Sequence, residues 1–248
     1  MAANNVHYDE KLAGVYDQMY PIEFDTSLAV DFIAALAPAG GRVLELGVGN
    51  GRIALPLAAR GFQVHGIDAS EAMLAVLRER DARNEVVTET GDFTETGTGL
   101  TFDVVTVVLN TFFVAVTKEQ QLGCLRLVRE QLVANGKFIL EAFDPAPYHA
   151  MEKQDFSMRH LADGAVMLDT LAVDRAHQLM YGTHTIVDGG RPETKHHVLR
   201  YAFPFELDLL AELAGLRLVD RWEDWERNPY TARSPRHVSV YERADAPA

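Results

Sequence analysis

A short apolar run that leads directly into a cluster of glycines constrains the fold of this chain more than any other feature. Residues 43–51 read VLELGVGNG, so a strand of buried character is followed at once by Gly47, Gly49 and Gly51. Glycine tolerates the backbone angles of a tight strand-to-helix turn and leaves space for a ligand where a Cβ would intrude. The pattern predicts a buried parallel strand, a nucleotide-binding loop and a helix over about 51–60.

Strand and helix patterns alternate on both sides of this loop. Short apolar segments predict strands at 42–46, 63–67, 85–88, 103–108 and 136–143, and later at 216–220 and 237–242. Helical spacing predicts helices over about 8–37, 71–80 and 204–214, and one that follows a capping box formed by Thr117 and Gln120. Ser70 is expected to cap the helix that begins at 71. Such alternation predicts a parallel sheet with right-handed crossovers.

The hydrophobic period changes between about 146 and 202. The segments 165–173, 180–187 and 196–202 alternate apolar and polar residues and are separated by turn signals. This period is typical of antiparallel strands. We therefore predict an α/β core formed by residues 1–145 and 203–248, interrupted by an antiparallel β insertion at 146–202.

The charge balance argues against several classes of partner, and the cysteine content excludes two kinds of cysteine-based structure. Lys and Arg number 23 against 36 Asp and Glu, and the net charge is −13. This balance argues against nucleic acid and anionic membrane as partners and favours a cationic substrate. A single cysteine, Cys124, excludes a disulfide framework and a multi-thiolate metal site. No secretory leader or membrane-spanning apolar run is present, so we expect the protein in the cytoplasm.

Acidic residues follow the strands that flank the glycine loop. Asp68 ends the second strand, where a carboxylate can accept hydrogen bonds from both hydroxyls of a ribose. Asp92 and Phe93 follow the third strand, an acid and an aromatic ring suited to the amino group and the face of adenine. The loop reads G-x-G-x-G after Glu45, which differs from the G-x-G-x-x-G of nicotinamide enzymes. A different nucleotide cofactor stays open at this point.

With these residues the chain resembles the class I S-adenosylmethionine-dependent methyltransferases, over about 42–143 and again over 203–242. The resemblance implies S-adenosyl-L-methionine as cofactor and a Rossmann-like, mostly parallel seven-stranded sheet flanked by helices, with its last strand antiparallel. It also implies a helical N-terminal lid over 1–40 and a β insertion that covers the substrate site. By this resemblance the cofactor-binding residues are Tyr16, Glu45, Gly47, Gly49, Gly51, Asp68, Ala69, Met73, Asp92, Phe93, Leu109 and Asn110.

The N-terminal tyrosines, the NTFF segment at 110–113 and the small β insertion are similar to those of antibiotic-biosynthesis N-methyltransferases acting on small molecules. This similarity implies methyl transfer to a small-molecule, cationic amine. Aromatic rings stabilise a cationic centre. We therefore predict that Tyr8, Tyr16, Phe112 and Phe113 surround the reacting nitrogen. The tyrosines could instead be core contacts of a surface helix.

Several alternatives remain open from the sequence. The acceptor could be a hydroxyl or a carbon, or the chain could be a catalytically silent binding subunit. No metal site is predicted, because neighbours such as His196 and His197 point to opposite faces of a strand. His184, His196 and Glu141 are candidates for the group that takes the proton from the amine. Self-association through the inserted sheet is also possible.

Overall fold

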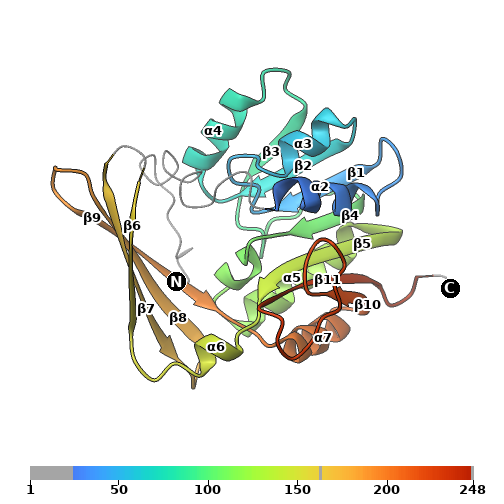
Figure 1. Ribbon diagram of the computed structural model, residues 1–248. Helices are drawn as coiled ribbons and strands as arrows, with labels where there is room; N and C mark the ends of the chain where they lie inside the picture. Colours follow the sequence, from blue (N-terminus) through green and yellow to red (C-terminus); the bar gives the residue numbers. More distant parts are fainter. Residues whose placement is uncertain (1–24, 162–163, 247–248) are drawn as a thin grey trace.

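A seven-stranded sheet forms the centre of the protein in the computed structural model, which describes residues 25–161 and 164–246 (Figure 1). Its order is β10-β11-β5-β4-β1-β2-β3. Strand β11 runs antiparallel to β5 and β10, whereas the neighbouring strands from β5 to β3 pair in parallel. The strands are β1 (Arg42–Leu46), β2 (Gln63–Asp68), β3 (Val86–Thr90), β4 (Phe102–Val107), β5 (Leu132–Phe143), β10 (Leu216–Trp222) and β11 (Arg236–Arg243). The predicted fold class is confirmed.

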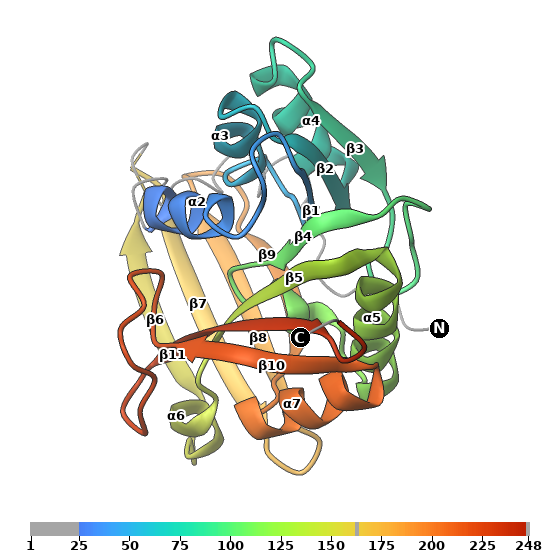
Figure 2. The ribbon, with the colours of Figure 1, turned by 90° about the vertical axis from the view of Figure 1, so that its right-hand side faces the viewer.

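Helices cover both faces of this sheet (Figure 2). Adjacent residues of β1 enter different cores, Leu44 on the face of α5 and α7 and Val43 on the face of α2, α3 and α4. A strand buried on both faces is mostly apolar, as Val43, Leu44 and Leu46 are here, and Glu45 is a buried exception. The helices are α2 (Thr26–Ala34), α3 (Ala54–Ala59), α4 (Glu71–Arg80), the 3-10 helix η1 (Thr111–Val114), α5 (Lys118–Gln131), α6 (Ala146–His149) and α7 (Pro204–Leu213).

Two helix starts follow the predicted capping chemistry. The Ser70 hydroxyl accepts the Met73 N–H at 3.2 Å. Thr117 accepts the Gln120 N–H through its hydroxyl at 3.1 Å, and the Gln120 side chain accepts the Thr117 N–H in return at 3.2 Å. Both arrangements satisfy amide groups that the first turn of a helix leaves without a partner.

A second, antiparallel sheet is inserted between β5 and α7. Its order is β6-β7-β8-β9, and its strands are β6 (Asp155–His160), β7 (Val166–Asp174), β8 (Leu179–Val187) and β9 (Glu193–Arg200). It stands beside the seven-stranded sheet, on the side to which β5 leads (Figure 1). The predicted antiparallel insertion is confirmed. Strand β6 was not predicted, because nearly all of its residues are exposed and give no apolar alternation.

The two faces of the four-stranded sheet differ. Leu171, Met180 and Leu199 lie on its inner face and belong to or pack against the core cluster that contains Phe112 and Phe113. The opposite, outer face exposes the large apolar side chains of Phe156, Met158 and Tyr181. Self-association through this sheet stays a prediction.

The predicted N-terminal lid lies mostly outside the described residues, and so do Tyr8 and Tyr16. Within the described part of that segment, α2 buries Phe32 and Ile33 against the core. None of the helices in the described residues is long and apolar enough to span a membrane.

Candidate functional site

The glycine loop after β1 needs glycine for both conformation and space. Gly47, Gly49 and Gly51 all have positive φ, at 71°, 53° and 83°. A Cβ placed on Gly47 would lie 2.3 Å from Cγ2 of Thr111, so η1 packs directly against this glycine. The Gly47 N–H also donates to the Ile67 carbonyl at 2.8 Å, which closes the turn toward β2. The loop is therefore held close to two neighbouring elements and leaves little room for side chains.

Asp68 faces this loop from the end of β2. One carboxylate oxygen accepts the Gly49 N–H at 2.8 Å, and the other accepts the Ser70 N–H at 2.8 Å. Burial raises the pKa of Asp68, and the hydrogen bonds from Ser70 and Gly49 oppose that rise. The backbone amides of Ser70, Gly49 and Ala69 do not use all four lone pairs of the carboxylate, so a positioned acceptor remains for a hydroxyl group of a ligand.

Glu45 lies beneath the loop and is 2% exposed. Its Oε2 atom has no hydrogen-bond partner among the residues that the structure describes. Burial raises the pKa of Glu45 to about 8, although the charge of Arg52 acts in the opposite direction. A buried carboxyl oxygen without a partner is costly. A cationic group of a bound molecule would satisfy it.

The other predicted cofactor residues lie nearby on neighbouring strands and loops. The methyl carbon of Met73 would be 3.2 Å from a Cβ on Gly49, so its side chain borders the glycine loop. Ala69 is exposed between Asp68 and Ser70. Asp92 is fixed by the N–H and hydroxyl of Thr94, at 2.9 and 2.8 Å, and Phe93 is buried. Loop glycines and acids distant in sequence thus meet at one end of β1, β2 and β3.

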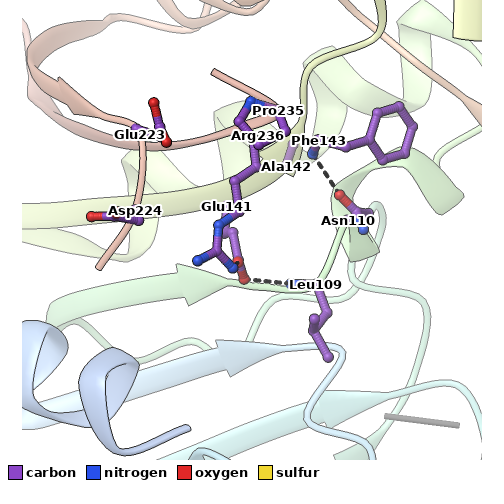
Figure 3. Close-up of a pocket in the computed structure, with 9 residues that line it drawn as sticks. All are labelled: Leu109, Asn110, Glu141, Ala142, Phe143, Glu223, Asp224, Pro235 and Arg236. Atoms are coloured by element: carbon purple, nitrogen blue, oxygen red, sulfur yellow. Dashed lines mark hydrogen bonds and ion pairs between the residues drawn. The ribbon is translucent and has the colours of Figure 1, made fainter. Parts of the chain in front are cut away.

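The turn after β4 is strained and is held by β5 (Figure 3). Leu109 and Asn110 both have positive φ, at 51° and 64°, and such a conformation costs of order 1–3 kcal/mol per residue. Glu141 accepts the Leu109 N–H through Oε2 at 3.0 Å and the Asn110 N–H through its carbonyl at 3.4 Å. Asn110 in turn accepts the Phe143 N–H at 2.6 Å. These three hydrogen bonds fix a backbone shape that the sequence did not reveal.

A cavity of about 440 Å³ opens beside this turn (Figure 3). Arg236 projects into it, forms an ion pair with Asp25 and lies 3.6 Å from Oε1 of Glu141. Burial raises the pKa of Glu141, while the hydrogen bond from Leu109 and the charge of Arg236 oppose the rise. The cavity is lined by Leu109, Asn110, Glu141, Ala142, Phe143, Glu223, Asp224, Pro235 and Arg236.

Phe112 and Phe113, predicted to face the reacting nitrogen, lie in η1. Both side chains are fully buried. Phe113 contacts Phe143 edge to face, with ring centroids 5.0 Å apart. Because Tyr8 and Tyr16 lie outside the described residues, the structure brings only two of the four predicted catalytic residues together, and their catalytic roles stay predictions.

The three candidates for a proton acceptor occupy different environments. Glu141 is engaged with the turn after β4. His196 is exposed on the outer face of the four-stranded sheet. His184 lies on the inner face and contacts Asp169, a partner that the sequence does not indicate because it is on another strand. Among the described residues, no three His, Cys, Asp or Glu side chains are grouped to hold a metal ion.

Comparisons with known proteins find methyltransferases similar to this chain. The methyltransferase domain family matches residues 43–136. The cypemycin N-terminal methyltransferase of a Streptomyces species is 30% identical over 95% of this chain and 97% of that protein. The structure of the CcbJ methyltransferase from Streptomyces caelestis is 39% identical, with a TM-score of 0.87 over 96% of this chain and 100% of that chain. CalS10 from Micromonospora echinaspora, an amino pentose methyltransferase with S-adenosylmethionine bound, is 21% identical, with a TM-score of 0.71 over 96% of this chain and 98% of that chain.

Proposed function

Because the chain belongs to the S-adenosylmethionine-dependent methyltransferases, we propose that it transfers a methyl group to the nitrogen of a small-molecule amine in specialised metabolism. The observation that carries this proposal is the similarity, over nearly the whole of both chains, to an enzyme named for methylation at an N-terminus. A net charge of −13 supports it, since a negative protein attracts a cationic amine.

The residues around the glycine loop fit this cofactor. When bound, S-adenosylmethionine supplies a methyl group already activated by its sulfonium. We assign Glu45, with its unpaired buried oxygen, to the cationic amino acid part, and Asp68 to the ribose hydroxyls. Asp92 and Phe93 are assigned to the adenine. The predicted contacts of Gly47, Gly49, Gly51, Ala69, Met73, Leu109, Asn110 and Tyr16 belong to the same proposal.

Because the cofactor supplies the activated methyl group, the protein itself must orient the amine, exclude water and remove a proton. Good alignment of reacting groups can supply about 7–11 kcal/mol of the barrier. An aliphatic amine is mostly protonated at neutral pH, so its proton must leave before the nitrogen can attack. We propose that Tyr8, Tyr16, Phe112 and Phe113 form an aromatic wall around that nitrogen, and that the four-stranded sheet covers it.

Calorimetry with S-adenosylhomocysteine tests the cofactor assignment. We expect the intact protein to bind it, and Asp68→Ala and Gly49→Val to weaken binding at least about 100-fold, or about 2.7 kcal/mol. The Asp68 variant loses the acceptor for the ribose, and the Gly49 variant forces a side chain into the loop. No binding by the intact protein would contradict the assignment.

Product analysis tests the acceptor. The protein is incubated with S-adenosylmethionine and each of three probes: trialanine, methyl α-glucosaminide and prolinamide. Mass spectrometry with fragmentation should locate the new methyl group on nitrogen. A methyl group on oxygen or carbon, or no transfer to any probe, would count against the proposal.

The aromatic wall is tested by comparing Tyr16→Ala with Tyr181→Ala. Tyr181 lies on the outer face of β8 and is 45% exposed, so it serves as the control. We expect the Tyr16 variant to lose more methyl transfer. Equal activity of the two variants would remove Tyr16 from the site.

A further inference from the structure

A group of polar side chains interrupts the apolar inner face of the four-stranded sheet. Asp169 on β7 pairs with His184 on β8, and His197 on β9 lies beside them. On one side of this group Leu171 and Met180 reach the main core, and on the other Met167 is fully buried. Polar groups placed between buried apolar residues need hydrogen-bond partners, and Asp169 and His184 supply one to each other.

The hydrogen bond between His184 and Asp169 fixes the proton on one ring nitrogen. Nδ1 of His184 lies 2.6 Å from Oδ1 of Asp169, and Arg159 donates to Oδ2 of Asp169 at 3.1 Å. Burial would raise the pKa of Asp169, but the hydrogen bond from His184 and the charge of Arg159 outweigh it and lower the pKa. An ionised carboxylate only accepts hydrogen bonds, so Nδ1 carries the hydrogen. Nε2 is then left with a free lone pair in the neutral ring.

His197 stacks on His184 with ring centroids 4.6 Å apart and an angle of 20° between the rings. Its ring lies over Gly182, where a Cβ would come within 2.1 Å of Nε2. Burial and the charge of His184 lower the pKa of His197 to about 4, so this ring is neutral near pH 7. Gly182 therefore provides the space for a second neutral imidazole beside the first.

This part of the sheet is anchored beside η1 and α5. Strand β9 packs next to η1. At its end, Arg200 donates to the Gln121 side chain of α5 at 2.6 Å, and the Gln121 amide donates to the Arg200 carbonyl at 2.8 Å. The side chains of His184 and Asp169 remain 17% and 19% exposed. The pair is thus fixed on the face directed toward η1, yet is not sealed from a ligand.

We propose that His184, oriented by Asp169, takes the proton from the ammonium group of the acceptor. This inference rests on the proposed function. The N–H bond of the ammonium breaks, its electron pair stays on nitrogen, and the proton moves to Nε2 of His184. The imidazolium is stabilised by Asp169 and later releases its proton to solvent. The neutral nitrogen can then act as the nucleophile.

Other charged groups lie on the same face of the four-stranded sheet as His184. They are Arg159 on β6, Asp169 on β7 and Lys195 on β9. His197 lies against the ring without charge near pH 7.

Nuclear magnetic resonance of the imidazole nitrogens tests the orientation without any turnover. In the intact protein we expect His184 in the tautomer protonated at Nδ1. Asp169→Asn can offer an amide donor to Nδ1 and should shift the population toward the Nε2-protonated form. An Nε2-protonated His184 in the intact protein would overturn the inference.

Kinetics test the role in the reaction, with whichever of the three probe amines the intact protein methylates. We expect His184→Gln to lower kcat about 100-fold, within the range of general base catalysis, with KM for S-adenosylmethionine unchanged. The acidic limb of its pH profile should move toward the pKa of the amine itself. His196→Gln, on the outer face of the neighbouring strand, is the matched control and should behave as the intact protein.

The two possible failures are distinguishable. If the intact protein methylates none of the probes, the proposed function fails and the inference falls with it. If it methylates a probe and His184→Gln keeps both its rate and its pH profile, the inference alone is wrong.

Discussion

The two sheets place their polar groups in different ways. In the seven-stranded sheet, Asp68 and the glycines lie at strand ends, and their contacts are largely with backbone amides. In the four-stranded sheet, Asp169, His184 and His197 lie within strands and contact one another. A strand buried on both faces is mostly apolar, and the polar side chains that it does hold, such as Glu45 in β1 and Glu141 in β5, lie near its carboxyl end. A sheet with one inner face can hold polar side chains in mid-strand.

This difference separates the two halves of the proposed reaction. The cofactor side depends on backbone conformation, and the acceptor side depends on side chains brought together by strand pairing. Substitutions in the seven-stranded sheet should therefore affect cofactor binding, and substitutions in the four-stranded sheet should affect acceptor turnover.

Gly47→Ala should have the largest effect. The added Cβ would lie 2.3 Å from Thr111 at a φ of +71°, so the loop or η1 must move. We expect calorimetry to show at least about a 100-fold loss of S-adenosylhomocysteine affinity, or about 2.7 kcal/mol. Gly61→Ala is the matched control, because Gly61 has a φ of +89° with no atom within 4 Å of its Cβ position. Similar losses in both variants would show that backbone strain, rather than the fit of the loop, is responsible.

Glu45→Gln should change how stability depends on pH. The pKa of Glu45 is raised from 4.5 to about 8 on folding, so the folded state binds a proton that the unfolded state has released between these values. The stabilisation that the protonated Glu45 side chain gives the folded state is present at low pH. It is lost as the pH rises through 8, by up to about 1.4 kcal/mol per pH unit. Urea unfolding without cofactor should show the variant gaining stability relative to the intact protein from pH 5 to 8.

Glu242→Gln is the control for that titration. Hydrogen bonding to Lys137 lowers the pKa of Glu242, so its stabilisation is already complete above the unfolded value. The difference in free energy of unfolding between Glu242→Gln and the intact protein should stay constant from pH 5 to 8. A constant difference for Glu45→Gln as well would mean that Glu45 is already ionised at neutral pH.

Gly182→Ala should affect only the acceptor side. Its Cβ would displace the His197 ring from the stack. We expect acceptor turnover to fall about 10-fold, equivalent to about 1.4 kcal/mol, with S-adenosylhomocysteine affinity unchanged. Thr185→Ala on the outer face of the same strand is the control. A loss of cofactor affinity in Gly182→Ala would contradict the separation between the two sheets.

Thr117→Ala should have the smallest effect, on stability alone. It removes the capping box of α5, which costs about 1 kcal/mol in typical cases. Thermal unfolding should show the loss, and Thr117→Ser, which keeps the hydroxyl, should show much less. A change in kcat would indicate that the start of α5 is coupled to the site.

Much of the structure around the proposed cofactor site could be predicted because its signals are local. The apolar run at β1, the positive-φ glycines and the caps at Ser70 and Thr117 depend on residues within a few positions of each other. The turn after β4 could not be predicted in this way. Leu109 and Asn110 gave no sign of positive φ, because hydrogen bonds from the distant strand β5 hold them there.

The sequence by itself determined the α/β core, the inserted antiparallel sheet and the glycine loop that we propose binds the cofactor, since periodicity and glycine geometry act over short stretches. Only the tertiary structure decided which side chains meet across strands. His184 faces Asp169 rather than solvent because strand register pairs them and because burial of Leu171 and Met180 turns that face inward. Neither register nor the choice of face is encoded in any one segment.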